Sequence, residues 1–103
     1  RAQEDSDLAD KLDALYDIQV LSANTTLGDH THVVAGADGL TFTLPVPTGD
    51  MFYYIKNYYG VDAKLTISGN GNNIDGQSSI VLDVPNVAVK CVFDYDSGEW
   101  FIY

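Results

Sequence analysis

Residues 40–57 of the 103-residue chain have the sequence LTFTLPVPTGDMFYYIKN, and this stretch carries the strongest structural signal. Residues 40–44 alternate leucine or phenylalanine with threonine, and the same period of two returns at residues 52–57. Alternation of this kind is typical of half-buried β-strands. Proline cannot donate a backbone hydrogen bond to a sheet, so Pro45 ends the first strand. The stretch therefore predicts two strands joined by a proline-containing loop.

Five further segments with strand character lie on either side of this stretch. They are residues 30–35, 64–68, 79–84, 87–94 and 99–103. A loop rich in glycine and asparagine covers residues 69–76, and Asp75-Gly76 within it predicts a tight turn. Short strands at roughly ten-residue spacing, with turn residues between them, predict an antiparallel sandwich or barrel. We expect a mainly β fold with about seven strands, forming one head domain over residues 23–103.

Residues 1–22 have a different pattern and predict a helical stalk. Leu8, Leu12 and Leu15 recur at intervals of four and three, which is typical of a helical seam, and the segment carries six acidic residues. An isolated helix this short is marginal in water, so the leucines must pack on something. The candidates are a parallel coiled coil and the body of the adjoining domain. We favour the coiled coil, because apolar residues are nearly confined to the seam; two heptads cannot choose between two and three strands.

The composition excludes several classes of partner. Fifteen acidic residues against five basic ones give a net charge of -10, which repels phosphate, so nucleic acid and anionic membranes are poor partners. The chain has no run of 18 apolar residues, so membrane insertion is not expected. The single cysteine, Cys91, excludes an intrachain disulfide framework and is expected to be a small buried hydrophobe. Because the chain starts at Arg1 without a leader, we expect a fragment of a larger protein.

His30-Thr31-His32 is the candidate metal site. Both imidazoles project from one face of a strand, and three copies in a parallel trimer would bring six nitrogens toward the axis, enough for an octahedral transition metal. In the alternative arrangement, one histidine faces solvent or a neighbouring subunit and the other pairs with a carboxylate such as Asp29. Two histidines close in sequence are a low-specificity signal, so we favour the alternative and expect no cofactor.

Tyr58 and Tyr59, next to Gly60, are the candidate surface contacts. Aromatic rings with a polar tip suit both sugar stacking and protein interfaces, and these two follow the predicted strand rather than lying in it. The acidic turn at residues 94–99 lacks the spacing of a calcium loop and predicts a hairpin. No nucleophile elbow or phosphate-binding loop is present in the sequence, so we do not expect an enzyme.

The β region resembles a small domain at the ends of tailed-bacteriophage fibres and related virion appendages. The resemblance covers about Thr25 to Tyr103 and rests on an ordered series of segments: Leu44-Pro45, Gly49, Phe52-Tyr53-Tyr54-Ile55-Lys56-Asn57, Ile74-Asp75-Gly76 and Gly98-Glu99-Trp100-Phe101-Ile102-Tyr103. Similar proteins are homotrimers in which a short coiled coil leads into a β head, and some fibres bind iron through a His-x-His pair in a needle-like stalk. The resemblance implies a structural protein of the virion, on its tail or capsid surface, without catalysis.

We therefore expect a homotrimer, held by Leu8, Leu12 and Leu15, whose β head attaches the virion to a host-surface glycan or protein. Three heads on one fibre would multiply a weak single-site affinity. A second hypothesis is a capsid-decorating fibre or an assembly connector that binds only other virion proteins. A third is a subunit of a glycan-degrading enzyme, which the lack of a clear carboxylate pair argues against.

Overall fold

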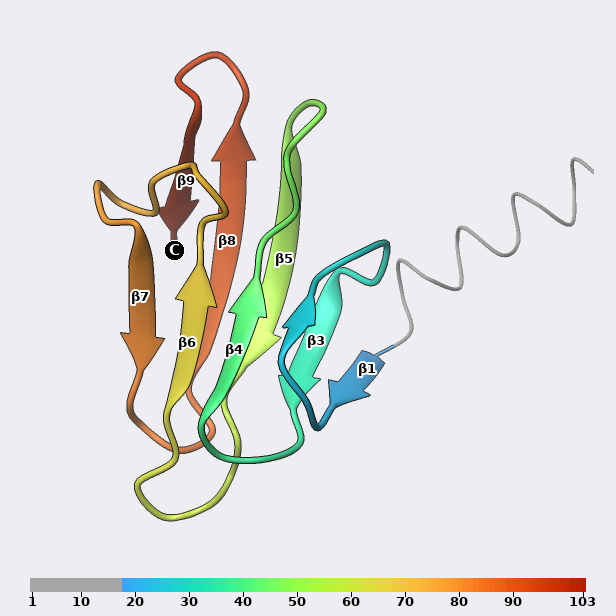
Figure 1. The fold of residues 1–103 in the computed structure, drawn as a ribbon, viewed down its shortest axis with the longest axis vertical. Helices are drawn as coiled ribbons and strands as arrows, with labels where there is room; N and C mark the ends of the chain where they lie inside the picture. The colour runs from blue at the N-terminus through green and yellow to red at the C-terminus, as the bar shows by residue number, and fades with distance from the viewer. Residues whose placement is uncertain (1–17) are drawn as a thin grey trace, which may run out of the picture.

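The computed structural model describes residues 18–103, which form nine strands in two stacked sheets (Figure 1). The five-stranded sheet contains, in spatial order, β1 (Ile18–Leu21), β3 (His32–Ala35), β5 (Met51–Lys56), β8 (Ala88–Asp94) and β9 (Glu99–Ile102). The four-stranded sheet contains β2 (Thr25–Thr26), β4 (Leu40–Thr43), β6 (Leu65–Ser68) and β7 (Ser79–Leu82). The mainly β fold is confirmed, and each of the seven predicted strands is present.

The predicted antiparallel pairing is wrong for half of the molecule. β1 pairs with β3, β3 with β5, β2 with β4 and β4 with β6, all in parallel. From β1 to β6 the chain passes from one sheet to the other at every connection, so neighbours within a sheet are two strands apart in sequence and run in the same direction. Antiparallel pairing is confined to β5/β8, β6/β7 and β8/β9. Alternation in a sequence indicates the face of each residue but not the direction of its partner strand.

Two strands were not predicted from the sequence. β1 lies at the end of the segment expected to be the stalk, and it extends the five-stranded sheet by pairing Ile18 with His32. β2 has two residues, which is too short for a periodic signal. The leucine seam at Leu8, Leu12 and Leu15 lies outside the described residues, so the helical stalk and the homotrimer stay predictions. Over residues 18–103 there is no helix long and apolar enough to cross a membrane.

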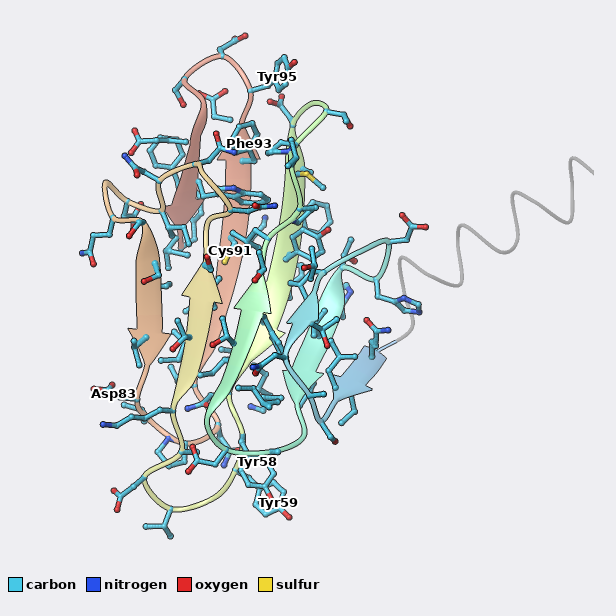
Figure 2. The ribbon with its side chains drawn as sticks, in the orientation of Figure 1. Tyr58, Tyr59, Asp83, Cys91, Phe93 and Tyr95 are labelled. Atoms are coloured by element: carbon cyan, nitrogen blue, oxygen red, sulfur yellow. The ribbon has the colours of Figure 1, made fainter. Side chains whose placement is uncertain are left out.

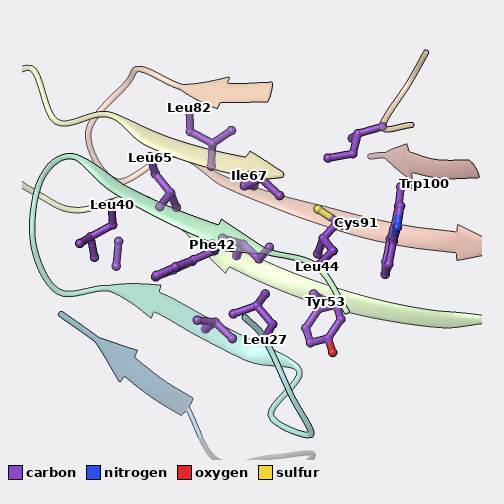
Figure 3. Packing of buried hydrophobic residues seen from close by; sticks show 14 of the residues in the cluster. Leu27, Leu40, Phe42, Leu44, Tyr53, Leu65, Ile67, Leu82, Cys91 and Trp100 are labelled. Atoms are coloured by element: carbon purple, nitrogen blue, oxygen red, sulfur yellow. The ribbon is translucent and has the colours of Figure 1, made fainter. Parts of the chain in front are cut away.

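The core lies between the two sheets (Figure 3). The four-stranded sheet contributes Phe42 and Ile67, and the five-stranded sheet contributes Tyr53, Cys91 and Trp100, each with no more than 1% of its surface exposed. Side chains alternate between the two faces along each strand, so these residues all lie on the inner face of their sheet. Burial, with a smaller effect of the Asp75 charge, raises the pKa of Cys91 to about 12, so the expectation of a buried hydrophobic cysteine is confirmed.

Two turns close the sheet edge at β9. Asp75 and Gly76 both have positive φ, 47° and 82°, as a type I′ turn requires, and they join the bridged pair of Ile74 and Gln77. The backbone N–H of Asp75 donates to the Trp100 carbonyl at 2.9 Å, so this loop covers the outer edge of β9. The acidic segment between β8 and β9 is a hairpin turn, as expected, with Gly98 at φ 73°.

Candidate functional site

Two loops at one end of the sandwich, residues 57–64 and 83–87, form the surface that we call the distal tip. The parallel strands β1, β3 and β5 all run toward this end. Figure 2 shows Tyr58, Tyr59 and Asp83 at this end, and Tyr95 at the other. The sequence-predicted tyrosines therefore lie at the end of the sandwich toward which β1 runs.

Asn57 holds the two loops of the distal tip together. Its side chain is 1% exposed, and Nδ2 lies within hydrogen-bond distance of the carbonyl oxygens of Ala63 (2.9 Å), Leu82 (3.2 Å) and Val84 (3.0 Å). Its Oδ1 accepts a hydrogen bond from the backbone N–H of Tyr58 at 2.8 Å. A buried amide with this many partners rigidifies its surroundings, because one side chain joins backbone groups from both loops. No pattern in the sequence indicates this role of Asn57, because its partners lie up to 27 residues away.

The two tyrosines have different environments. Their ring centroids are 4.4 Å apart, with the planes tilted by 42°. Tyr58 is half-buried and packs against the core, whereas Tyr59 is 71% exposed. A side-chain hydrogen bond with Tyr59 raises the pKa of Tyr58, and the charge of Asp38 adds to the shift. Tyr58 is therefore a support for the ring of Tyr59, which is the side chain available to a ligand.

Gly60 allows the loop to fold back over this ring pair. A Cβ atom at position 60 would lie 2.9 Å from the ring of Tyr58, which is too close for any other residue without a shift. The loop then turns at Asp62, with φ 58°, and the Ala63 N–H donates to the Gly60 carbonyl at 3.2 Å. This compact turn leaves Val61 with 89% of its surface exposed, the highest value among the large apolar side chains in residues 18–103.

Val84, on the neighbouring loop, is a third exposed apolar side chain of the distal tip, at 57%. The backbone N–H of Asn86 donates to the Tyr58 carbonyl at 3.0 Å, which fixes this loop beside the tyrosines. Asp62 and Asp83 are exposed at the same end. The distal tip therefore presents both exposed apolar side chains and carboxylates. Neither valine was predicted, because a single apolar residue in a loop gives no periodic signal.

His32 lies on the outer face of the five-stranded sheet. Its ring stacks on that of Tyr54, with centroids 4.9 Å apart and an interplanar angle of 21°, and its Nδ1 is 3.1 Å from the Thr31 hydroxyl. His30 precedes β3 and is half-buried. Within residues 18–103, no three His, Cys, Asp or Glu side chains gather as a metal site would require. The axial site between three copies at His30 and His32 stays a prediction.

A pocket of about 300 Å³ opens at the end opposite the distal tip. Its lining includes Asp29, Asp50, Phe52 and Tyr53. The Tyr53 hydroxyl donates to the Gly28 carbonyl at 2.6 Å, and burial, followed by the charge of Asp29, raises the pKa of Tyr53 to about 12. The phenol is thus a fixed structural donor. Asp50 is also engaged, because its Oδ1 accepts a hydrogen bond from the Tyr95 N–H at 2.8 Å.

No protein-family model matches this chain, and no curated protein matches it either. The functional proposal is therefore built on the residues and geometry of the molecule.

Proposed function

We propose that this chain is the β head of a homotrimeric bacteriophage fibre that attaches the virion to the host surface. The observation that carries the proposal is the distal tip: Tyr59 and Val61 project into solvent at the end of the sandwich toward which β1 runs, on loops fixed by the buried Asn57. A fibre presents its binding surface away from its stalk, and the predicted stalk precedes Ile18.

The chemistry of the distal tip suits a neutral glycan. An exposed tyrosine ring offers an apolar face to the C–H groups of a sugar and a hydroxyl to its polar edge. The nearby Asp62 and Asp83 carboxylates can accept hydrogen bonds from sugar hydroxyls, and they disfavour phosphorylated or acidic saccharides. Because the loops are held in place before binding, little conformational entropy is lost on contact.

A trimer would make such a weak contact effective. Three identical heads on one stalk convert later binding events into intramolecular ones, which raises the overall affinity when the target surface repeats. The leucine seam at Leu8, Leu12 and Leu15 and the resemblance to trimeric fibre heads both support three copies. In this proposal the head acts by binding alone, on the tail or capsid surface of the virion and in contact with other virion proteins.

The test is a pull-down of a panel of bacterial cells and, in parallel, of emptied phage capsids. The Tyr59→Ala variant is compared with Tyr95→Ala, a tyrosine that is 57% exposed at the opposite end. We expect cell binding by the unmodified chain, about a tenfold loss or more for Tyr59→Ala, as for an aromatic hot spot, and no loss for Tyr95→Ala. Equal binding by both variants would refute the role of the distal tip.

The other hypotheses give different results in the same experiment. Retention on emptied capsids without retention on any cell would identify a capsid fibre or connector. Shortening of a bacterial polysaccharide during incubation would identify a glycan-degrading subunit.

A further inference from the structure

The outer face of the five-stranded sheet is apolar, although it points away from the core. Cross-strand register places Phe52 beside Val92 and Val92 beside Phe101 in one row, and Ile18, His32 and Tyr54 in the next. We call the surface formed by Ile18, Val20, Phe52, Tyr54, Val92 and Phe101 the apolar face. Ile18 and Val20 are 66% and 63% exposed, and Phe52 and Tyr54 are 38% and 40% exposed. A contiguous patch of this kind on a sheet marks an interaction surface.

The charge distribution permits two copies to meet on this face. Of the 15 acidic residues, six precede Ile18 and nine belong to residues 18–103; all nine lie in loops or at the end residue of a strand. The apolar face therefore has no carboxylate at its centre. Two lysines lie on the same side of the sheet: Lys56 donates to the Asn86 carbonyl at 2.7 Å, and Lys90 lies 5.5 Å from the ring centroids of both Phe52 and Tyr54. Two copies of a chain of charge -10 therefore repel each other less when they meet on this sheet face than when they meet at the loop ends, where the carboxylates lie.

The position of β1 in the chain indicates that other copies of the chain cover the apolar face. β1 forms one edge of the apolar face and supplies Ile18 and Val20. Ile18 follows Leu15, the last residue of the predicted seam, by three positions. Copies joined through that seam would hold their β1 strands close together, at high effective concentration.

We infer that the apolar face is buried against other copies of this chain, around the axis of the trimer. The inference rests on the proposed function for the existence of the trimer, and it adds the surface through which the heads contact one another. Burial of Phe52, Tyr54 and Val92 between copies would complete a second core, and it would cover the edge of β1 that has no partner strand within residues 18–103.

Hydroxyl-radical footprinting of the full chain tests the inference directly. Tyr54, at 40% exposure, is compared with Tyr59 and Tyr95, at 71% and 57%, which lie outside the apolar face. In the assembled protein we expect Tyr54 to be oxidised at least about fivefold more slowly than Tyr95, because interface cores exclude water. On dilution to single chains the difference should shrink to about 1.4-fold, the ratio of the exposed fractions of Tyr95 (57%) and Tyr54 (40%).

Two matched valine variants provide the second measurement. Val20 on β1 and Val81 on β7 are both on edge strands, outward-facing and more than half exposed, at 63% and 55%. We expect Val20→Lys to raise the concentration at which the trimer dissociates by about tenfold or more, since it buries an unpaired charge, and Val81→Lys to leave it unchanged. Both variants should fold, because neither valine contributes to the core.

The outcomes separate the inference from the proposed function. A trimeric wild type in which Tyr54 is oxidised as fast as Tyr95, and Val20→Lys assembles normally, would overturn the inference and leave the fibre proposal standing. A wild type that is a single chain under all conditions would overturn both.

Discussion

The two outer faces of the sandwich have opposite compositions, although the strands beneath them alternate in the same way. Apart from Val81, the four-stranded sheet presents hydroxyl groups to the outside: register places Thr41 beside Thr66, Thr43 beside Ser68, and Ser68 beside Ser79. The five-stranded sheet presents Phe52, Tyr54, Val92 and their neighbours instead. A sheet with one solvated face should have polar residues there, and only the four-stranded sheet follows this rule. The outer face of the four-stranded sheet is therefore an internal control for the apolar face.

The largest loss of stability is expected from a substitution on the inner face of the four-stranded sheet. Phe42→Ala should lower the free energy of unfolding by about 3 to 5 kcal/mol, because it removes a fully buried ring. The measurement is urea unfolding at a fixed chain concentration. A loss below about 1 kcal/mol would mean that the space between the sheets is less well packed than the burial of Phe42 indicates.

Asn57→Asp tests the link between the two sheets. The substitution preserves the shape of the side chain but replaces the Nδ2 donor with a carboxylate oxygen that faces the Ala63, Leu82 and Val84 carbonyls. We expect a loss of about 3 kcal/mol, since a buried polar network loses its donor and gains repulsion. Lys56→Met, next to it in the chain, removes one exposed hydrogen bond to the Asn86 carbonyl and serves as the control, with little effect. Equal stability of wild type and Asn57→Asp would contradict the role given to the amide.

Alkaline pH should destabilise the domain through two side chains of the five-stranded sheet, Cys91 and Tyr53. The pKa of each is raised to about 12, from 9.0 for the thiol and 10.0 for the phenol. The folded state therefore holds these protons more tightly than the unfolded state, so their stabilisation is complete below pH 9 and is lost as the pH rises toward 12. Cys91→Ala should remove the part of this loss that begins near pH 9. An unchanged pH profile would show that the thiol does not titrate on unfolding.

The strand positions could be predicted from the sequence because Phe42, Tyr53 and similar residues alternate with polar ones. The direction of the strands could not be predicted, because connections such as residues 36–39 and 57–64 are compatible with a hairpin as well as with a crossover between sheets. For the same reason, alternation alone did not reveal the apolar face. Alternation places Phe52 and Tyr54 on one face of their strand, and the register with Val92 and His32 shows which side chains of the neighbouring strands share that face.

The candidate site was predictable in part. Tyr58 and Tyr59 stand out as aromatic residues beside a glycine, and Tyr59 is indeed exposed. Asn57 and Val84 have no local signal, because their significance comes from contacts between loops distant in sequence.

Tyr54→Ser should have a smaller effect that depends on assembly. In a single chain it removes stacking with His32 and the contact with the Lys90 ammonium, worth about 1 kcal/mol together. At concentrations where the trimer forms, the loss should be greater, because a buried ring is removed from the interface. Thermal unfolding at several concentrations measures the difference, and the same loss at every concentration would argue against burial of the apolar face.

The smallest effect is expected on the hydroxyl face. Thr66→Ala should change the free energy of unfolding by less than about 0.5 kcal/mol at any concentration, since Thr66 points outward from the centre of the four-stranded sheet. Urea unfolding of this variant beside Tyr54→Ser sharpens the comparison of the two faces. A large, concentration-dependent loss for Thr66→Ala would show that the interface between copies lies on the four-stranded sheet, not on the apolar face.

The central claim is that the apolar face belongs to an assembly of three chains. Sedimentation equilibrium of the full chain over a wide concentration range measures this most directly. We expect a mass of three times 11.2 kDa, about 34 kDa, that falls toward one chain only on dilution. A folded protein of 11.2 kDa at every concentration would contradict the claim.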